Sequence, residues 1–384
     1  MTLKEELEAL RGEPINVFSG NPKDIPCVET SDEARLCRRP VVSVNMITYN
    51  HENYIAQALE GVMRQETDFE FELVIGEDCS QDRTRDICFE YQRKYPEKIR
   101  VLWWHENVSR LGGNSRRVMA RCRGTYIAFC EGDDYWTDTH KLQKQVDALQ
   151  RNPNVGFVFT GAKIFDEVSR TAEIWRGEAS YSQGVIRGID FYRIYSFGKN
   201  SKLGMGPECF IMTASCMLRR SILERLTAKY EIFNWKLLIG DKQRWLGMSL
   251  MGDVYYLKEN TVVYRRNAGG AMNRHRNLIF RDSSIVKLYF AIVGPYRCTV
   301  PFAVIASVFL SRDGMPVDYW ASCREELAAM RSIMKRCDVS FEGMKLGSRI
   351  RWHVFFAVKR RFVFCVNRAS LKLLWRTSFV KSKL

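Results

Sequence analysis

The feature that most constrains the fold is a short hydrophobic segment that ends in a cluster of acids. Tyr126–Cys130 has the length and the β-branched and aromatic content of a buried strand, and Glu131, Gly132, Asp133 and Asp134 follow it directly. Residues two apart on an extended chain point to the same side, and the glycine lets the backbone turn. Acids this close repel one another, so they indicate either a bound hard divalent cation or a solvated loop that caps the next helix.

Upstream segments repeat the pattern of a strand, a polar turn and a helix. The predicted strands are Val41–Ile47, Phe69–Ile75 and Ile99–Trp104. This alternation predicts an α/β fold with a mixed, mostly parallel sheet flanked by helices. Ligands of such sheets bind at the carboxyl ends of the strands, so we expect the polar residues there to share one cleft. These residues are Thr48, Tyr49 and Asn50 after the first strand, Glu77 and Asp78 after the second, and the acids after Cys130.

Single residues of this set remain open to two interpretations. Asp78 closes its strand with no local partner, which suits a hydrogen bond to a nucleobase edge or a ribose, but an Asx turn or a helix cap is equally consistent. Tyr49 is placed to stack on a base or simply to pack. Asp241 stands at the start of a helical pattern that includes Trp245 and Leu246, where it is either a helix cap or an acid presented to a site.

Several of these segments together resemble a known family. They read VVSVNMITYNHENYIAQALEGVMRQ, FELVIGEDCSQDRTRDI and GTYIAFCEGDDYWTDTHKLQKQV, and a further segment reads GDKQRWLGMSLMGDVYYLKENTVVYRRNAGGAMN. They are similar to a family-two inverting glycosyltransferase with the Rossmann-like GT-A fold. The resemblance implies transfer of a sugar from a nucleotide diphosphate donor to an acceptor hydroxyl, with Mg²⁺ or Mn²⁺ as cofactor, in the assembly of polysaccharide or lipopolysaccharide.

The resemblance also assigns roles to residues. It implies that Asp78 contacts the nucleobase, that Asp133 and Asp134 bind the ribose and the metal, and that Asp241 is the catalytic base. Tyr264 and Arg265 would begin a loop over the diphosphate. The chain departs from the family pattern at Glu77 and Glu131, which replace aspartates, at Ser115 and Arg116, which replace an Arg-Asn pair, and at Asn267, which replaces a histidine.

The resemblance divides the chain into three parts. Residues 1–39 would form a leading helix and linker, residues 40–275 the glycosyltransferase domain, and residues 276–384 a basic C-terminal helical extension. Within the domain, residues 40–150 are the nucleotide-binding half and residues 151–275 the acceptor half.

Net charge is concentrated at the C-terminal end. The formal charge is +15, and residues 341–384 hold eleven Lys or Arg and one Glu. Clustered bases there alternate with aromatic and aliphatic residues, which suits peripheral attachment to an anionic membrane near a lipid-linked acceptor, or else a helix packed on the domain. The uncharged stretch from Cys298 to Ser311 is shorter than the ~20 residues of a membrane-spanning helix.

Composition narrows the cellular setting and the rival functions. The twelve cysteines form no CxxC pair, and the N-terminus lacks the pattern of a secretory signal, so we expect a cytoplasmic protein with reduced thiols, either free or peripheral on the inner face of the membrane. A nucleic-acid partner is not expected, because the predicted cleft is acidic. A catalytically inactive nucleotide-sugar binding module and, less well supported, a nucleotidyltransferase remain as alternatives.

Overall fold

The computed structural model describes residues 27–108, 114–197, 211–234 and 240–267, together with Val286 and Phe290. All of these lie in the first of two compact units, Met1–Cys337 and Asp338–Leu384. The predicted leading helix and the basic segment 345–384 lie outside the described residues, as does almost all of the predicted C-terminal extension. The three-part division of the chain therefore stays a prediction.

Strands and helices alternate along most of the described chain. The strands are β1 (Val28–Thr30), β2 (Val42–Thr48), β3 (Phe71–Glu77), β4 (Ile99–Trp103), β5 (Tyr126–Phe129), β6 (Tyr135–Trp136), β7 (Val155–Asp166), β8 (Thr171–Ile174), β9 (Gly184–Ile186), β10 (Met217–Arg219) and β11 (Asp253–Arg266). The helices are α2 (Ile55–Met63), α3 (Thr84–Lys94), α4 (Asn114–Met119), α5 (Lys141–Arg151), α6 (Gly188–Phe197), α7 (Arg220–Lys229) and α8 (Gly240–Ser249), with short 3₁₀ turns at Arg176–Ser180, Thr213–Ser215 and Glu231–Asn234.

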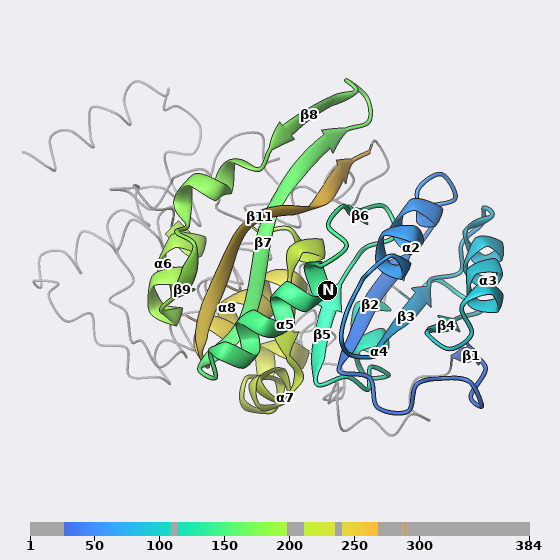
Figure 1. The fold of residues 1–384 in the computed structure, drawn as a ribbon, viewed down its shortest axis with the longest axis horizontal. Coiled ribbons are helices and arrows are strands. Elements are labelled where there is room, and N and C mark those ends of the chain that lie inside the picture. Colours follow the sequence, from blue (N-terminus) through green and yellow to red (C-terminus); the bar gives the residue numbers. More distant parts are fainter. Residues whose placement is uncertain are drawn as a thin grey trace, which may run out of the picture. The chain divides into compact units, whose positions relative to one another are not determined.

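The strands form one mixed sheet, in the order β1-β4-β3-β2-β5-β10-β7-β11-β6 (Figure 1). β2 is parallel to both β3 and β5, and β3 is parallel to β4. β10 then runs antiparallel between β5 and β7, and β7 pairs in parallel with the long β11. The prediction of an α/β fold with a mostly parallel central sheet flanked by helices is confirmed.

Burial explains why the central strands are hydrophobic on both faces. Every residue of β3 is buried, and six of the seven residues of β2 are. α2 shows the helical counterpart, because its buried residues Ile55, Ala58, Leu59 and Val62 recur at spacings of three and four. Strands buried on both faces read as continuous apolar runs, as in parallel sheets covered by helices.

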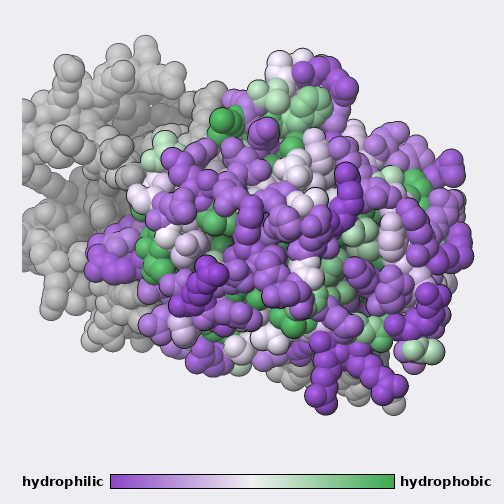
Figure 2. Space-filling view, in the orientation of Figure 1, coloured by the Kyte–Doolittle hydropathy of each residue, from purple (hydrophilic) through white to green (hydrophobic). Residues whose placement is uncertain are grey.

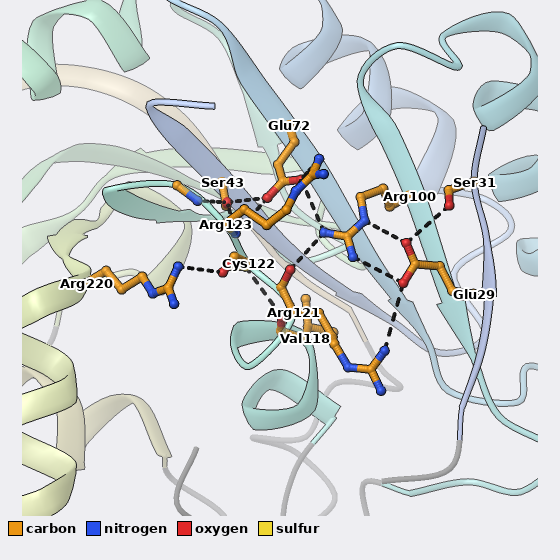
Figure 3. Close-up of polar contacts among 11 residues, drawn as sticks. Glu29, Ser31, Ser43, Glu72, Arg100, Val118, Arg121, Cys122, Arg123 and Arg220 are labelled. Carbon is orange, nitrogen blue, oxygen red and sulfur yellow. Dashed lines mark hydrogen bonds and ion pairs between the residues drawn. The ribbon is translucent and has the colours of Figure 1, made fainter. Parts of the chain in front are cut away.

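A buried ion cluster stabilises the sheet at the ends of the strands away from the acidic loop (Figure 3). The carboxylate of Glu72, near the start of β3, is fully buried and accepts hydrogen bonds from the guanidinium groups of Arg123 (2.6 and 2.8 Å) and Arg100 (3.2 Å). Arg100 also binds Glu29 of β1 at 2.7 and 3.1 Å. Ser43 of β2 donates a further bond of 2.6 Å to Glu72. Glu72 therefore links three strands and the turn before β5.

The face of the molecule in Figure 2 is mostly hydrophilic, with hydrophobic side chains in small scattered groups. None of the described helices has the length and apolar character required to cross a membrane. The seven described cysteines are all free thiols.

Candidate active site

The polar residues that follow β2, β3 and β5 lie side by side. Thr48 at the end of β2 is in register with Glu77 at the end of β3. The backbone N–H of Asp78 donates to the carbonyl of Thr48 (3.1 Å), and the N–H of Gly132 donates to the carbonyl of Ile47 (2.9 Å). Three motifs far apart in sequence therefore meet at one edge of the sheet, as predicted.

Gly132 allows the acidic loop to pass very close to the loop after β2. A Cβ atom at position 132 would lie 2.6 Å from Oγ1 of Thr48 and 2.9 Å from Nδ1 of His51. The Thr48 hydroxyl and His51 Nδ1 are themselves 3.2 Å apart, and His51 Nε2 lies 3.9 Å from Oδ2 of Asp133. His51 is thus an additional polar side chain in the cleft, to which the sequence alone gave no role.

The two acids predicted to bind metal have different surroundings. Asp134 is 2% exposed, and its Oδ1 accepts a hydrogen bond of 2.9 Å from the backbone N–H of Arg265 on β11. The side chain of Asp133 is 22% exposed, and its Oδ2 accepts a bond of 3.0 Å from the amide of Asn267. Asp133 is therefore the acid that a ligand can reach, with Asp134 behind it.

The charges of the acidic loop are suited to a divalent cation whose ligands come partly from the protein and partly from the substrate. Burial, together with Asp133 and Glu131, raises the pKa of Asp134 well above its usual range. A bound cation would reverse this repulsion. Within the described part of the chain no group of three His, Cys, Asp or Glu side chains is arranged to hold a metal ion by itself. Mg²⁺ commonly takes only one or two protein carboxylates and completes its shell with phosphates and water, so the residues present fit such an ion.

The predicted nucleotide-binding acids after β3 are both fully buried. The carboxylate of Glu77 accepts a bond from the backbone N–H of Ser80 (2.7 Å) and forms an ion pair with Arg85. Asp78 accepts a bond of 2.6 Å from the backbone N–H of Val108. Both carboxylates thus shape the loops that border the cleft, and Glu77 in particular has both oxygens engaged by the protein.

The loop after β2 presents two predicted residues closer to solvent. Tyr49 is half-buried and Asn50 is exposed. Asn50 has a φ of 55°, and its side-chain oxygen accepts a bond of 2.8 Å from the backbone N–H of Gln81. Asparagine tolerates this left-handed conformation better than most residues, which explains its place at the turn.

Asp241, from the second half of the chain, lies near the acidic loop. It stands in the first turn of α8 and is partly exposed. Burial and, to a lesser extent, the charges of Asp133 and Asp241 together raise the pKa of Glu131 to about 7, against the opposing charge of Arg244. Arg244, three residues after Asp241, lies over the ring of Phe129 at 5.0 Å, so the start of α8 lies near the end of β5.

Two arginines of this region were not given a role by the sequence. Arg244 is one turn after Asp241 in α8 and is only 6% exposed. Arg116 of α4 donates a hydrogen bond of 3.2 Å to the side chain of Gln243. In the structure every residue of α8 from Lys242 to Ser249 is buried. A charged arginine in the sequence of this helix was the only sign of a special role, and its burial could be seen only in the structure.

Comparison with known proteins shows which family of enzymes the chain resembles. Residues 43–227 match the model of Glycosyl transferase family 2. Over this segment, a little under half of its length, the chain is similar to that family, as the resemblance of its motifs indicated.

The chain spans only about half to three fifths of the length of the curated relatives described here. An uncharacterized protein of Mycobacterium bovis is 32% identical over 235 residues, which is 60% of this chain and 60% of that protein. A putative teichuronic acid biosynthesis glycosyltransferase of Bacillus subtilis, TuaG, is 36% identical over 126 residues, 33% of this chain and 48% of that protein. Among solved structures, S. aureus TarS 1-349 in complex with UDP-GlcNAc has a similar fold, with a TM-score of 0.55 at 15% identity over 77% of this chain and 82% of that one.

Proposed function

We propose that this chain is an inverting glycosyltransferase that moves a sugar from a nucleoside diphosphate donor to an acceptor hydroxyl in the assembly of a cell-surface polysaccharide or lipopolysaccharide. The observation that supports this most is the position of Asp241. Its charge acts on Glu131, although 110 residues of chain separate α8 from the loop after β5. An acid brought to a cleft in this way is available for proton transfer.

Asp241 is the general base of this mechanism. A sugar hydroxyl is a weak nucleophile at neutral pH, and removal of its proton during attack lowers the barrier. Attack from the face opposite the leaving diphosphate inverts the anomeric carbon. Asp241 lies in the first turn of α8, and alignment of the two substrates would supply much of the remaining rate increase.

The donor would lie along the ends of β2, β3 and β5. Tyr49 and Asn50 border the nucleoside, Thr48 and Asp78 shape its pocket, and Asp133 contacts the ribose or the diphosphate. Asp133 with Asp134 behind it would hold a divalent cation, which when bound supplies a Lewis acid that stabilises charge on the departing diphosphate. Arg265, whose guanidinium donates to the carbonyl of Asp133 (2.8 Å), keeps this loop in position.

The relatives support the type of pathway. The name of TuaG places that protein in teichuronic acid biosynthesis, and the TarS structure contains a UDP-activated sugar. We extend this to a nucleotide-sugar donor and a saccharide or lipid-linked acceptor for this chain. Peripheral attachment to the cytoplasmic face of a membrane remains a prediction for the basic segment 345–384.

The test is a hydrolysis screen of UDP-, GDP- and dTDP-activated sugars with the full-length protein, with and without Mn²⁺. We expect release of one nucleoside diphosphate that requires Mn²⁺ or Mg²⁺ and is lost in Asp241→Asn. Binding of a nucleotide sugar without hydrolysis or transfer to any acceptor, unchanged in Asp241→Asn, would instead support a catalytically inactive binding module.

A further inference from the structure

The side chain of Arg244 is buried close to the proposed base and has no partner there. It follows Asp241 by three residues, so both side chains lie on the same face of α8. Its guanidinium packs over the ring of Phe129 at 5.0 Å and beside the ring of Trp245 at 5.6 Å. Its Nη1 lies 3.5 Å from where a Cβ on Gly240 would stand, which directs this end of the guanidinium to the start of the helix.

No hydrogen bond satisfies this guanidinium within the described residues. Nε of Arg244 is buried and unpaired, and no carboxylate of the described chain is within 4.0 Å of it. A buried arginine without an acceptor is rare, because it forfeits the hydrogen bonds that water gave it. The side chain is therefore poised for an acceptor that the protein itself does not supply.

Glu131, just after the end of β5, is the complementary case. Its Oε2 is buried and has no hydrogen-bond donor among the described residues. Glu131 follows Phe129 by two residues, and residues two apart on extended chain point to the same side, which is the side that Arg244 covers. The charge of Arg244 lowers the pKa of Glu131, which agrees with this placement of the unpaired donor and the unpaired acceptor near the same end of β5.

We infer that Arg244 and Glu131 together bind hydroxyl groups of a neutral sugar beside Asp241, and that Arg244 determines which sugars the enzyme accepts. This rests on the proposed glycosyl transfer. A hydroxyl group both accepts a hydrogen bond from a guanidinium and donates one to a carboxylate, so it satisfies both side chains at once. An anionic group would pair with Arg244 but would meet the carboxylates of Glu131 and Asp241.

Charges of both signs surround Arg244. Burial and the charge of Arg244 lower the pKa of Arg116 to about 10. The carboxylates of Glu131, Asp133 and Asp241 belong to the same region, and they would repel an anionic ligand. Arg116 also positions α8 through Gln243, whose amide donates in turn to the carbonyl of Ile232 at 3.0 Å.

Either the transferred sugar or the acceptor sugar can supply these hydroxyl groups. The two sources are separated by measuring hydrolysis of the donor without acceptor and transfer with acceptor. A raised KM for the donor in the first assay assigns the site to the transferred sugar. An effect confined to the KM of the acceptor in the second assigns it to the acceptor.

The experiment compares the wild-type chain with Arg244→Met, Arg244→Lys and Glu131→Gln. The wild type is expected to use a neutral nucleotide sugar at least about tenfold better than UDP-glucuronate. Arg244→Met should raise KM for the neutral sugar about tenfold or more, as loss of a charge-assisted hydrogen bond does, and Arg244→Lys should only partly restore it because the planar fork is lost. Glu131→Gln should reduce the ratio of activity with the neutral nucleotide sugar to activity with UDP-glucuronate, because a carboxylate that repels the glucuronate is removed.

Three controls keep the outcome specific. Arg187→Met, at a side chain that is 75% exposed, should leave both KM values unchanged. Far-ultraviolet circular dichroism on heating checks that each variant folds, with Arg244→Lys as the milder change. Affinity for the free nucleoside diphosphate, measured by calorimetry, should stay within about twofold in Arg244→Met.

Other outcomes would overturn the inference. An unchanged KM in a folded Arg244→Met, a wild-type preference for UDP-glucuronate, or a loss of nucleoside diphosphate affinity that matches the change in KM would each do so. If the wild type turns over no nucleotide sugar at all, the proposed function itself fails. Turnover that is insensitive to Arg244 and Glu131 rejects only the sugar-binding role.

Discussion

The carboxylate of Asp134 accepts a hydrogen bond of 2.9 Å from the backbone N–H of Arg265, 131 residues later in the chain. The bond is buried and joins the acidic loop after β5 to the end of β11. It fixes Asp134 behind Asp133, so that the more accessible acid faces the cleft. The order of the two acids, which the sequence presents as equivalent neighbours, is thereby determined by a contact with the second half of the chain.

Replacement of these two acids should have different effects. Asp134→Ala leaves a buried N–H unpaired and should lower the free energy of unfolding by about 1–3 kcal/mol, in addition to abolishing Mn²⁺-dependent donor binding. Asp133→Ala should abolish the Mn²⁺ dependence with little loss of stability, because its side chain is partly exposed. Urea denaturation and calorimetric titration of the donor with Mn²⁺ measure the two effects. Unchanged donor titration in both variants would contradict the metal site.

Asp241→Asn should abolish transfer and leave donor binding largely intact. The amide has the shape of the carboxylate but cannot take the proton of the acceptor hydroxyl, so the rate should fall by about 10²–10⁴-fold. The measurement is kcat for transfer together with the affinity for the nucleoside diphosphate. Asp190→Asn, at the start of α6, is the matched control and should retain wild-type turnover. Normal kcat in Asp241→Asn would remove this residue from the mechanism.

Glu72→Gln should destabilise the fold without a direct effect on the cleft. It leaves Arg100 and Arg123 without their shared buried carboxylate, and loss of one partner of a buried ion pair costs roughly 3–5 kcal/mol. A lower urea midpoint is expected. The control is Glu66→Gln, whose side chain is 67% exposed and pairs only with His140 among the described residues. Equal midpoints for the two variants would show that the cluster adds little to stability.

Lys141 should make the stability depend on pH above neutrality. It is fully buried in α5 over the ring of Trp136, and burial lowers its pKa to about 7. In the unfolded chain the lysine keeps its proton up to a pH of about 10.4, so between these values the unfolded state binds more protons and stability rises with pH. Below pH 7 Lys141 is protonated in both the folded and the unfolded chain, so its contribution to the free energy of unfolding no longer changes with pH.

The variant Lys141→Met removes this dependence. The difference in unfolding free energy between the wild type and Lys141→Met should shift in favour of the wild type by on the order of 1–2 kcal/mol between pH 7 and pH 9. The difference is used because buried cysteines such as Cys88, whose pKa is raised by burial, affect both proteins equally. Parallel stability curves for the two proteins would show that Lys141 stays charged when folded.

Much of the architecture was predictable because its causes are local. The central strands are apolar on both faces since helices cover them, and the position of the polar residues after β2, β3 and β5 follows from the parallel pairing of these strands. The start of α8 next to Asp241 was also expected from the helical spacing of Trp245 and Leu246. The roles assigned to Asp78, Asp133, Asp134 and Asp241 remain predictions.

Other properties of the cleft depend on contacts between remote residues. Glu77 was predicted to bind the nucleotide, but Arg85 and the backbone of Ser80 engage both of its oxygens. His51, Asn267 and Arg244 acquired their significance only from what lies next to them in space. No spacing rule in the sequence indicates such neighbours, because they come from different elements.

The sequence by itself determined the class of fold, the edge of the sheet at which the polar residues gather, and the acidic character of that edge, because hydrophobic periodicity and strand order follow from consecutive residues. Only the tertiary structure decided which acids are accessible, which are already paired, and which arginine stands unpaired beside Asp241. Burial and pairing are properties of surroundings assembled from distant segments, and they set the charge and hydrogen-bonding capacity of each group.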